Sequence, residues 1–336
     1  MELSTDYMGL ALRNPLVASA SPLSKTVDGV RRLVDAGVGA VVLYSLFEEQ
    51  LRREAALNAR LAEAGTESFP ESLSYFPAGG RGGARPAPLP EPARARRGRR
   101  RGPVIGSLNG VTPGGWTGYA RAMQDAGAAA IELNIYYLPG DPHISGRDVE
   151  QRHIDVLTRV KDAVSVPVAV KLGPHVSSTG EMALRLDEAG ADGLVHFNRF
   201  LQPDIDPDTL AVVPTVGLSI PAEARLPRTW IALLHGRVRA ALAATTGVEE
   251  PADVARYLLA GADVVMTTSA LLRHGPAHAA VLLDGLSAWM ARKGFTTVEE
   301  LRGILAVAPD TDESAHERAG YVSALREANS RPYGPW

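Results

Sequence analysis

The chain has 336 residues, with 35 Lys and Arg against 38 Asp and Glu, a net charge of -3 and no cysteine. These values exclude disulfide scaffolds, thiolate metal sites, iron-sulfur clusters and a cysteine base, and they provide no overall field for nucleic acid. No apolar run reaches the ~18 to 20 residues of a membrane span, and the N-terminus lacks signal-peptide features, so we expect a cytoplasmic protein with no membrane or nucleic-acid partner.

Eight short apolar runs alternate with amphipathic or Ala-rich stretches along the chain. This alternation is typical of a parallel sheet with crossover helices. The runs are residues 16–20, 40–45, 104–109, 130–135, 168–172, 193–198, 239–245 and 263–269. Because eight parallel strands close a barrel, the sequence predicts an α/β protein with one (β/α)8 TIM barrel over residues 1–305.

A repeated helix-plus-glycine signature precedes four of these runs. It reads VDAGVGA at 34–40, QDAGAAA at 124–130, DEAGADG at 187–193 and LLAGADV at 258–264. Each copy predicts a helix that ends at glycine and turns directly into the next strand, and one isolated helix cap would not explain four copies. We predict a closing helix over 271–294 and a polar C-terminal tail over 306–336.

One segment departs from this composition. Residues 77–102 consist almost entirely of Gly, Pro, Ala and Arg, with no apolar periodicity, so we predict a disordered or loosely attached loop. Its basic end at 94–101 lacks interleaved aromatic residues. We therefore interpret this end as a solvated charge run rather than a nucleic-acid patch.

The active site of such a barrel lies at the C-terminal ends of its strands. The polar residues at these ends are Ser19, Ser21, Tyr44, Ser45, Asn109, Asn134, Tyr136, Tyr137, Lys171, His196, Asn198, Thr245, Thr246, Thr268 and Ser269. Small hydroxyl and glycine residues after the last two strands favour a phosphate site, with ordinary helix caps as the alternative. No zinc-ligand spacing, dinucleotide motif or P-loop occurs, and we predict no metal.

Lys171 is the one lysine of four that lies within a strand-like apolar run, VAVKLGP. A lysine inside a barrel is rarely buried without a partner, which indicates an anionic ligand or a chemical role, although a snorkelling lysine is the alternative. It could form a Schiff base or stabilise a cofactor anion. Asn134 and Asn198 look like an amide pair that flanks a planar ligand.

Taken in order, NPLVASASPLS, ELNIYYLPGDP, VAVKLGP, GLVHFNR, AATTGV and MTTSALLRHGP resemble the dihydroorotate dehydrogenase family of flavin enzymes. The similarity is greatest to its cytosolic class and to related bacterial proteins, and it covers residues 1–76 and 103–305. The resemblance implies FMN at the barrel mouth and, as in many family members, a homodimer. For the isoalloxazine, the resemblance implies contacts with Ser19, Ala20 and Ser21, a hydrogen bond from Asn134, and Lys171 near the N1/O2 edge. For the phosphate, it implies a site formed by Thr246, Gly247, Thr268 and Ser269.

Several positions depart from the family pattern. Tyr44 replaces a lysine at the end of the second strand, and the family's cysteine or serine base falls at Tyr136-Tyr137, which we assign to Tyr137. A phenol, with a reference pKa near 10, is a poor base unless a cation lowers that pKa. Pro139 replaces an asparagine, and Thr246 replaces one glycine of a phosphate-binding pair. The Arg/Gly/Pro tract stands where the family has a helix before the third strand, and our hypothesis is a reading-frame shift or a natural insertion that replaced this helix.

We therefore expect an FMN-dependent oxidoreductase that acts on a C-C bond next to a carbonyl in a small cyclic substrate. Oxidation of dihydroorotate to orotate in pyrimidine biosynthesis is the candidate reaction. Tyr137, or a water that it holds, would handle the proton, and Asn109, Asn134 and Asn198 would orient the substrate's amide edge. The alternatives are a Schiff-base lyase that uses Lys171, and a barrel that binds flavin or phosphate without catalysis.

Overall fold

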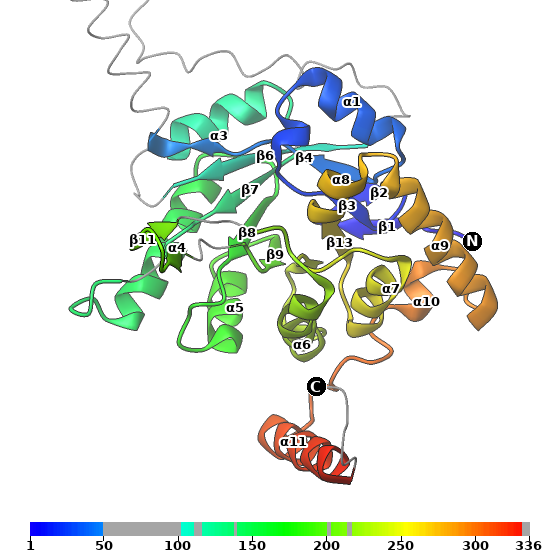
Figure 1. Ribbon diagram of the computed structural model, residues 1–336. Helices are drawn as coiled ribbons and strands as arrows, with labels where there is room; N and C mark the ends of the chain where they lie inside the picture. Colours follow the sequence, from blue (N-terminus) through cyan, green and yellow to red (C-terminus); the bar gives the residue numbers. More distant parts are fainter. Residues whose placement is uncertain (50–101, 111–115, 138–139, 200–202, 214–216, 331–336) are drawn as a thin grey trace, which may run out of the picture.

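The computed structural model describes residues 1–49, 102–110, 116–137, 140–199, 203–213 and 217–330 (Figure 1). Eight parallel strands form a closed barrel: β3 (Leu16–Ala18), β4 (Ala40–Val42), β6 (Val104–Asn109), β7 (Ala130–Asn134), β8 (Val168–Leu172), β9 (Gly193–His196), β12 (Ala241–Ala244) and β13 (Val264–Thr267). Neighbours in this order pair in parallel, and β13 pairs with β3 to close the ring. Each of these eight strands falls within a predicted run, which confirms the (β/α)8 barrel.

Helices surround the barrel (Figure 1). They are α1 (Val27–Asp35), α3 (Trp116–Asp125), α4 (Gly146–Lys161), α5 (Thr179–Glu188), α6 (Arg225–Leu234), α7 (Pro251–Ala260), α8 (Ser269–His274), α9 (His278–Lys293) and α10 (Val298–Leu301), and a further helix, α11 (Glu313–Ser330), follows them in the chain. The predicted single closing helix over 271–294 is wrong, because α8 and α9 replace it. Gly275 has a φ of +83° and is followed by Pro276, which removes a backbone donor and stops the first helix.

The four repeated glycines behave as the sequence predicts. Gly37, Gly127, Gly190 and Gly261 have φ values of +107°, +98°, +90° and +112°. A side chain is strained in this left-handed region, so glycine allows the chain to leave the helix and enter the next strand without that cost.

The barrel interior forms its own hydrophobic cluster, separate from the layer between strands and helices. Ile105, Ala130, Ala169 and Val195 point inward from four consecutive strands. An N-terminal hairpin that the sequence did not reveal, β1 (Thr5–Tyr7) with β2 (Leu10–Leu12), adds Tyr7, Met8 and Leu12 to this cluster. In the described part of the chain, these side chains fill the N-terminal end of the barrel, which leaves its C-terminal end for the approach of a ligand.

Other elements lie outside the eight-stranded ring. β5 (Leu46–Phe47) pairs with the end of β6, and β10 (Asp204–Asp206) forms an exposed hairpin with β11 (Ala211–Val213). The predicted C-terminal tail contains α11, which lies apart from the barrel in Figure 1. The predicted loop lies outside the described residues up to position 101. None of the described helices has the length and apolar character needed to cross a membrane.

Candidate active site

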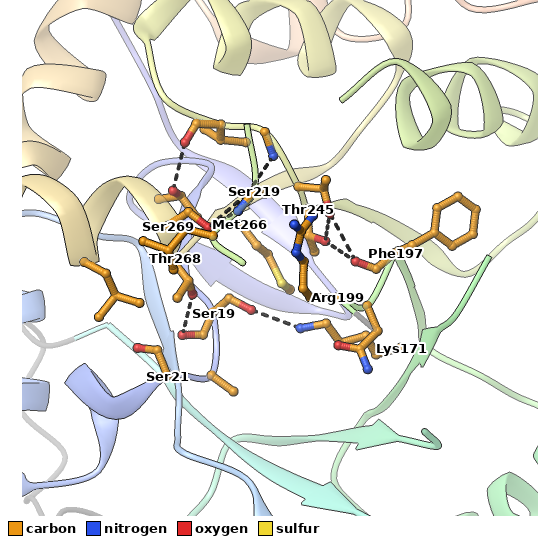
Figure 2. A pocket seen from close by; sticks show the side chains of 18 of the residues that line it. Ser19, Ser21, Lys171, Phe197, Arg199, Ser219, Thr245, Met266, Thr268 and Ser269 are labelled. Atoms are coloured by element: carbon orange, nitrogen blue, oxygen red, sulfur yellow. Dashed lines mark hydrogen bonds between the residues drawn. The ribbon is translucent and has the colours of Figure 1, made fainter. Parts of the chain in front are cut away.

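A cleft of about 240 Å³ opens at the C-terminal ends of β3, β8, β9, β12 and β13 (Figure 2). Most of the predicted site residues border it: Ser19, Ala20, Ser21, Lys171, Asn198, Thr246, Gly247, Thr268 and Ser269. These residues follow the C-terminal ends of different strands, and the barrel brings them around one cavity, as expected for the active site of such a fold. Asn109, Asn134 and Tyr137 are not among the residues that border this cleft.

Lys171 supplies a buried positive charge beside the cleft. Its side chain points into the barrel from β8, is 8% exposed, and donates a hydrogen bond to Ser19 Oγ at 3.1 Å (Figure 2). The backbone N-H of Ser19 donates to the carbonyl of Thr267 at 3.1 Å, which fixes the start of the loop after β3. The lysine also lies 3.5 Å from Glu132 Oε1. The ammonium group is therefore held at the boundary between the barrel interior and the cleft.

Small polar groups form a cradle at the other side of the cleft. Ser219 Oγ donates to Ser269 Oγ at 2.9 Å and accepts from the backbone N-H of Gly247 at 3.1 Å. Gly247 has a φ of +69°, and a Cβ at this position would lie 2.7 Å from the carbonyl oxygen of Ile220. Only glycine fits here, so backbone and hydroxyl groups approach one another closely, as an anion site requires.

Charged side chains anchor the loop that carries Ser219. Arg273 Nη2 donates to the carbonyl of Ser219 at 2.9 Å, and its Nη1 lies 2.6 Å from Glu249 Oε2. Burial raises the pKa of Glu249, but hydrogen bonds from His274 and Arg273 outweigh this effect and hold that pKa below its usual value. Glu249 therefore stays ionised and keeps the guanidinium directed at the Ser219 loop.

Arg199 adds a second cation to the residues that border the cleft. Its Nε donates to the carbonyl of Gly217 at 2.7 Å, and its Nη1 pairs with Glu223. Burial raises the pKa of Glu223, but hydrogen bonds from the Ile220 backbone and from Arg199 lower it by more. The guanidinium is thus fixed in place by one carbonyl and one carboxylate.

The amide residues lie at equivalent heights on neighbouring strands. Asn109 on β6 pairs in register with Asn134 on β7, which pairs with Lys171 on β8. Asn198 Nδ2 donates to Asn134 Oδ1 at 2.8 Å, so the predicted amide pair is in direct contact. Asn198 borders the cleft, whereas Asn134 reaches it only through this hydrogen bond.

Tyr137 lies in a small second pocket rather than in the main cleft. Tyr136, His153 and Asn198 also line this pocket, and Asn198 is common to both cavities. The Arg152 guanidinium lies 4.2 Å from the centre of the Tyr137 ring, a cation-π contact that fixes the ring. The predicted base therefore lies beside the cleft, next to the amide that connects the two spaces.

Tyr44, which the resemblance in sequence aligns with a lysine, is not among the residues that border the cleft. Lys25 Nζ lies 5.5 Å from the centre of its ring, and the ring packs against Phe47 at 6.1 Å. The aromatic side chain therefore has a cation beside it at the mouth of the barrel.

Sequence reasoning missed three polar residues of the cleft, Arg199, Ser219 and Thr267. Arg199 directly follows Asn198 at the end of a predicted strand, so the strand-end rule could have found it. Ser219 follows the β10–β11 hairpin, and no local pattern marks it as a site residue.

Comparison with known proteins gives one consistent result. The family model described as Dihydroorotate dehydrogenase matches residues 2–290. The catalytic subunit of dihydroorotate dehydrogenase B (NAD(+)) from Methanothermobacter thermautotrophicus is 27% identical over 321 residues, which cover 90% of this chain and 98% of that protein. The protein of the same name from Methanocella arvoryzae is 29% identical over 319 residues, which cover 90% of this chain and 98% of that protein. The Escherichia coli K12 NAD-dependent dihydropyrimidine dehydrogenase subunit PreA is 26% identical over 340 residues, which cover 93% of this chain and 80% of that protein.

Proposed function

The chain belongs to the dihydroorotate dehydrogenase family of oxidoreductases, and from this membership we propose that it binds FMN and acts on a C-C bond next to a carbonyl in a small cyclic substrate. The observation that carries the proposal is the buried ammonium group of Lys171 at one side of a cleft whose other side is the Gly247 cradle. A buried cation and an anion cradle at opposite sides of one cavity suit a ligand with a polar ring and a phosphate.

The residues of the cleft fit FMN. The Gly247 N-H and the hydroxyls of Ser219 and Ser269, which bond to one another in this structure, would turn to the phosphate when it binds, with Thr246 and Thr268 beside them. Ser19, Ala20, Ser21 and Lys171 would contact the isoalloxazine. FMN, when bound, supplies the hydride acceptor. The ammonium group of Lys171 would stabilise negative charge on the bound ring, because a fixed cation in a water-poor site needs no rearrangement during the reaction.

The substrate would occupy the space between the cleft and the small pocket. Asn198 borders both cavities and is oriented by Asn134, so its amide can recognise the amide edge of a cyclic substrate. Asn109 lies next to Asn134 in the β6–β7 register and would support the same edge. Tyr137, or a water that it holds, would take up or release the substrate proton.

The names of the relatives point to two related substrates, dihydroorotate and a dihydropyrimidine, and we propose dihydroorotate as the first to test. The Lys171 ammonium has Ser19 and Glu132 as partners, which favours an electrostatic role over Schiff-base formation. The expected homodimer and the cytoplasmic location stay predictions, and light scattering of the purified protein tests the first.

The test begins with an absorption spectrum of the purified protein, followed by denaturation and identification of the released chromophore. Dihydroorotate is then added anaerobically to a second sample. We expect FMN that bleaches. FMN that stays oxidised would contradict dihydroorotate as substrate and make dihydrouracil the next compound to test. A folded, colourless protein that FMN does not reconstitute would overturn the proposed cofactor.

A further inference from the structure

Glu132 is a buried carboxylate inside the barrel, on the side of Lys171 that faces away from the cleft. It lies on β7, two residues before Asn134, which is the register partner of Lys171 on β8. Alternate residues of β7 point inward, so Glu132 lies one interior layer nearer the N-terminal end of the barrel than Asn134. Its side chain is 1% exposed, and its Oε1 lies 3.5 Å from Lys171 Nζ.

The surroundings of Glu132 contain little else that could balance its charge. Its second oxygen, Oε2, has no hydrogen-bond partner within the described part of the chain, and the hydroxyl of buried Tyr7 also has none there. Burial, together with the negative charges of Glu132 and Asp263, raises the pKa of Tyr7, so this phenol stays neutral. Among the described residues, Lys171 is the cation that lies within ion-pair distance of Glu132.

The two distances at Lys171 show how the ammonium is shared. Its contact with Glu132 is longer than the ~2.7 to 2.9 Å of a strong charge-assisted hydrogen bond, whereas the bond to Ser19 at 3.1 Å is closer to the usual length. The lysine is therefore not locked onto the interior carboxylate. It lies between a fixed negative charge inside the barrel and the cleft outside.

We propose that Glu132 is a positioning residue that holds the Lys171 ammonium at the cleft and offsets part of its positive charge there. This inference rests on the proposed FMN site. In a water-poor interior, a carboxylate 3.5 Å from an ammonium group lowers the positive potential that the ammonium exerts on a ligand nearby. Glu132 thereby limits how strongly the site prefers reduced FMN over oxidised FMN.

The test compares the two-electron reduction potential of bound FMN in Glu132→Gln and Lys171→Met with that of the wild type. Glu132→Gln keeps the shape and removes the negative charge, so we expect the preference for reduced over oxidised FMN to rise about tenfold, a shift of about +30 mV. Lys171→Met removes the positive charge and is expected to shift the potential in the opposite direction. A mere loss of packing would not produce shifts of opposite sign.

Glu150→Gln is the matched control. Glu150 is also buried and lies 3.5 Å from an arginine, Arg185, but it is on α4, outside the barrel interior. We expect it to leave the potential unchanged. Glu132→Asp keeps a charge within the barrel and is expected to shift the potential less than Glu132→Gln. A Glu132→Gln potential equal to or below the wild-type value would overturn the proposal.

A second measurement separates this inference from the proposed function. In the FMN-free protein, the melting temperatures of Glu132→Gln, Lys171→Met and the double variant form a cycle. We expect the double variant to lose less than the sum of the two single losses, because each single change leaves one buried charge without its partner. Additive losses would contradict the pairing of Glu132 with Lys171, whereas non-additive losses in a wild type that does not bind FMN would support this pairing and contradict the proposed cofactor.

Discussion

Lys171 and Ser19 join opposite sides of the barrel: β8 and β3 lie four strands apart around the ring of eight, and the Lys171 ammonium donates to Ser19 Oγ at 3.1 Å. The bond therefore crosses the mouth of the barrel. Below it, the interior holds Glu132 and packed apolar side chains, and beyond it the cleft opens. A ligand in the cleft meets this lysine from outside the barrel.

Replacing Lys171 by methionine should weaken FMN binding. A hydrogen bond to a charged group contributes about 1.5 to 3 kcal/mol, so we expect the Kd to rise roughly 10- to 100-fold. Quenching of flavin fluorescence measures this Kd. Lys161→Met provides the control, because Lys161 pairs with Asp192 at 2.6 Å and is not among the residues that border the cleft. Wild-type affinity and turnover in Lys171→Met would remove this residue from the site.

Replacing Gly247 by alanine should disrupt the anion cradle. The new Cβ would lie 2.7 Å from the Ile220 carbonyl oxygen and 2.9 Å from Ala224 Cβ, so the backbone must shift. Gly294→Ala is a matched control, since Gly294 has a φ of +81° and its added Cβ would meet no atom within 4 Å. Both changes should cost about 1 to 2 kcal/mol through backbone strain, but only Gly247→Ala should weaken FMN binding. Equal FMN affinity in both variants would contradict the cradle.

The sequence revealed the barrel because its signals are local. Each strand is a short apolar run, and Gly37, Gly127, Gly190 and Gly261 mark the ends of helices by a conformation that suits glycine. The β1–β2 hairpin was missed because its strands have three residues each and are defined by where Tyr7 packs, inside the barrel. Packing partners of this kind cannot be read from spacing along the chain.

The candidate site was predictable to the extent that it follows from strand ends. Lys171, Asn198 and Ser269 border the cleft because the barrel brings these ends together. Ser219 comes from a loop whose position depends on Arg273, a contact between residues 54 apart in the chain. Tyr137 follows a turn in which the Tyr136 N-H donates to the Asn134 carbonyl at 3.0 Å, and this turn leads the chain to the small pocket.

His196 should make the folded protein less stable in mild acid. Burial lowers the pKa of His196 from 6.5 to about 4, because the charged imidazole loses its solvation in the protein interior. Below pH ~6.5 the unfolded chain binds a proton that the folded protein does not, so stability falls as the pH decreases towards 4. Between pH 7 and 5 this contributes a loss of about 2 kcal/mol.

Urea unfolding at pH 7 and pH 5 measures this loss. In His196→Leu we expect the decrease between the two pH values to be smaller by about 2 kcal/mol, whatever the effect of the change on stability at pH 7. The same substitution at exposed His143 is the control and should keep the wild-type pH dependence. An unchanged decrease in His196→Leu would show that another group causes the acid sensitivity.

Tyr137→Phe tests whether the phenol handles the substrate proton. The change removes the hydroxyl and keeps the ring that stacks on Arg152, so the small pocket should retain its shape. If the hydroxyl, or a water that it holds, transfers the proton, the rate of FMN reduction by dihydroorotate should fall by about 10²- to 10⁴-fold, with FMN affinity unchanged. Anaerobic stopped-flow absorption measures this rate.

Tyr321→Phe is the matched control, because Tyr321 on α11 also has an arginine beside its ring, Arg318 at 6.0 Å, and is not among the residues that border the cleft. A wild-type rate in Tyr137→Phe would exclude the phenol, and the search for the base would then move to the other groups of the small pocket, beginning with His153, whose pKa burial lowers so that it is neutral and able to accept a proton.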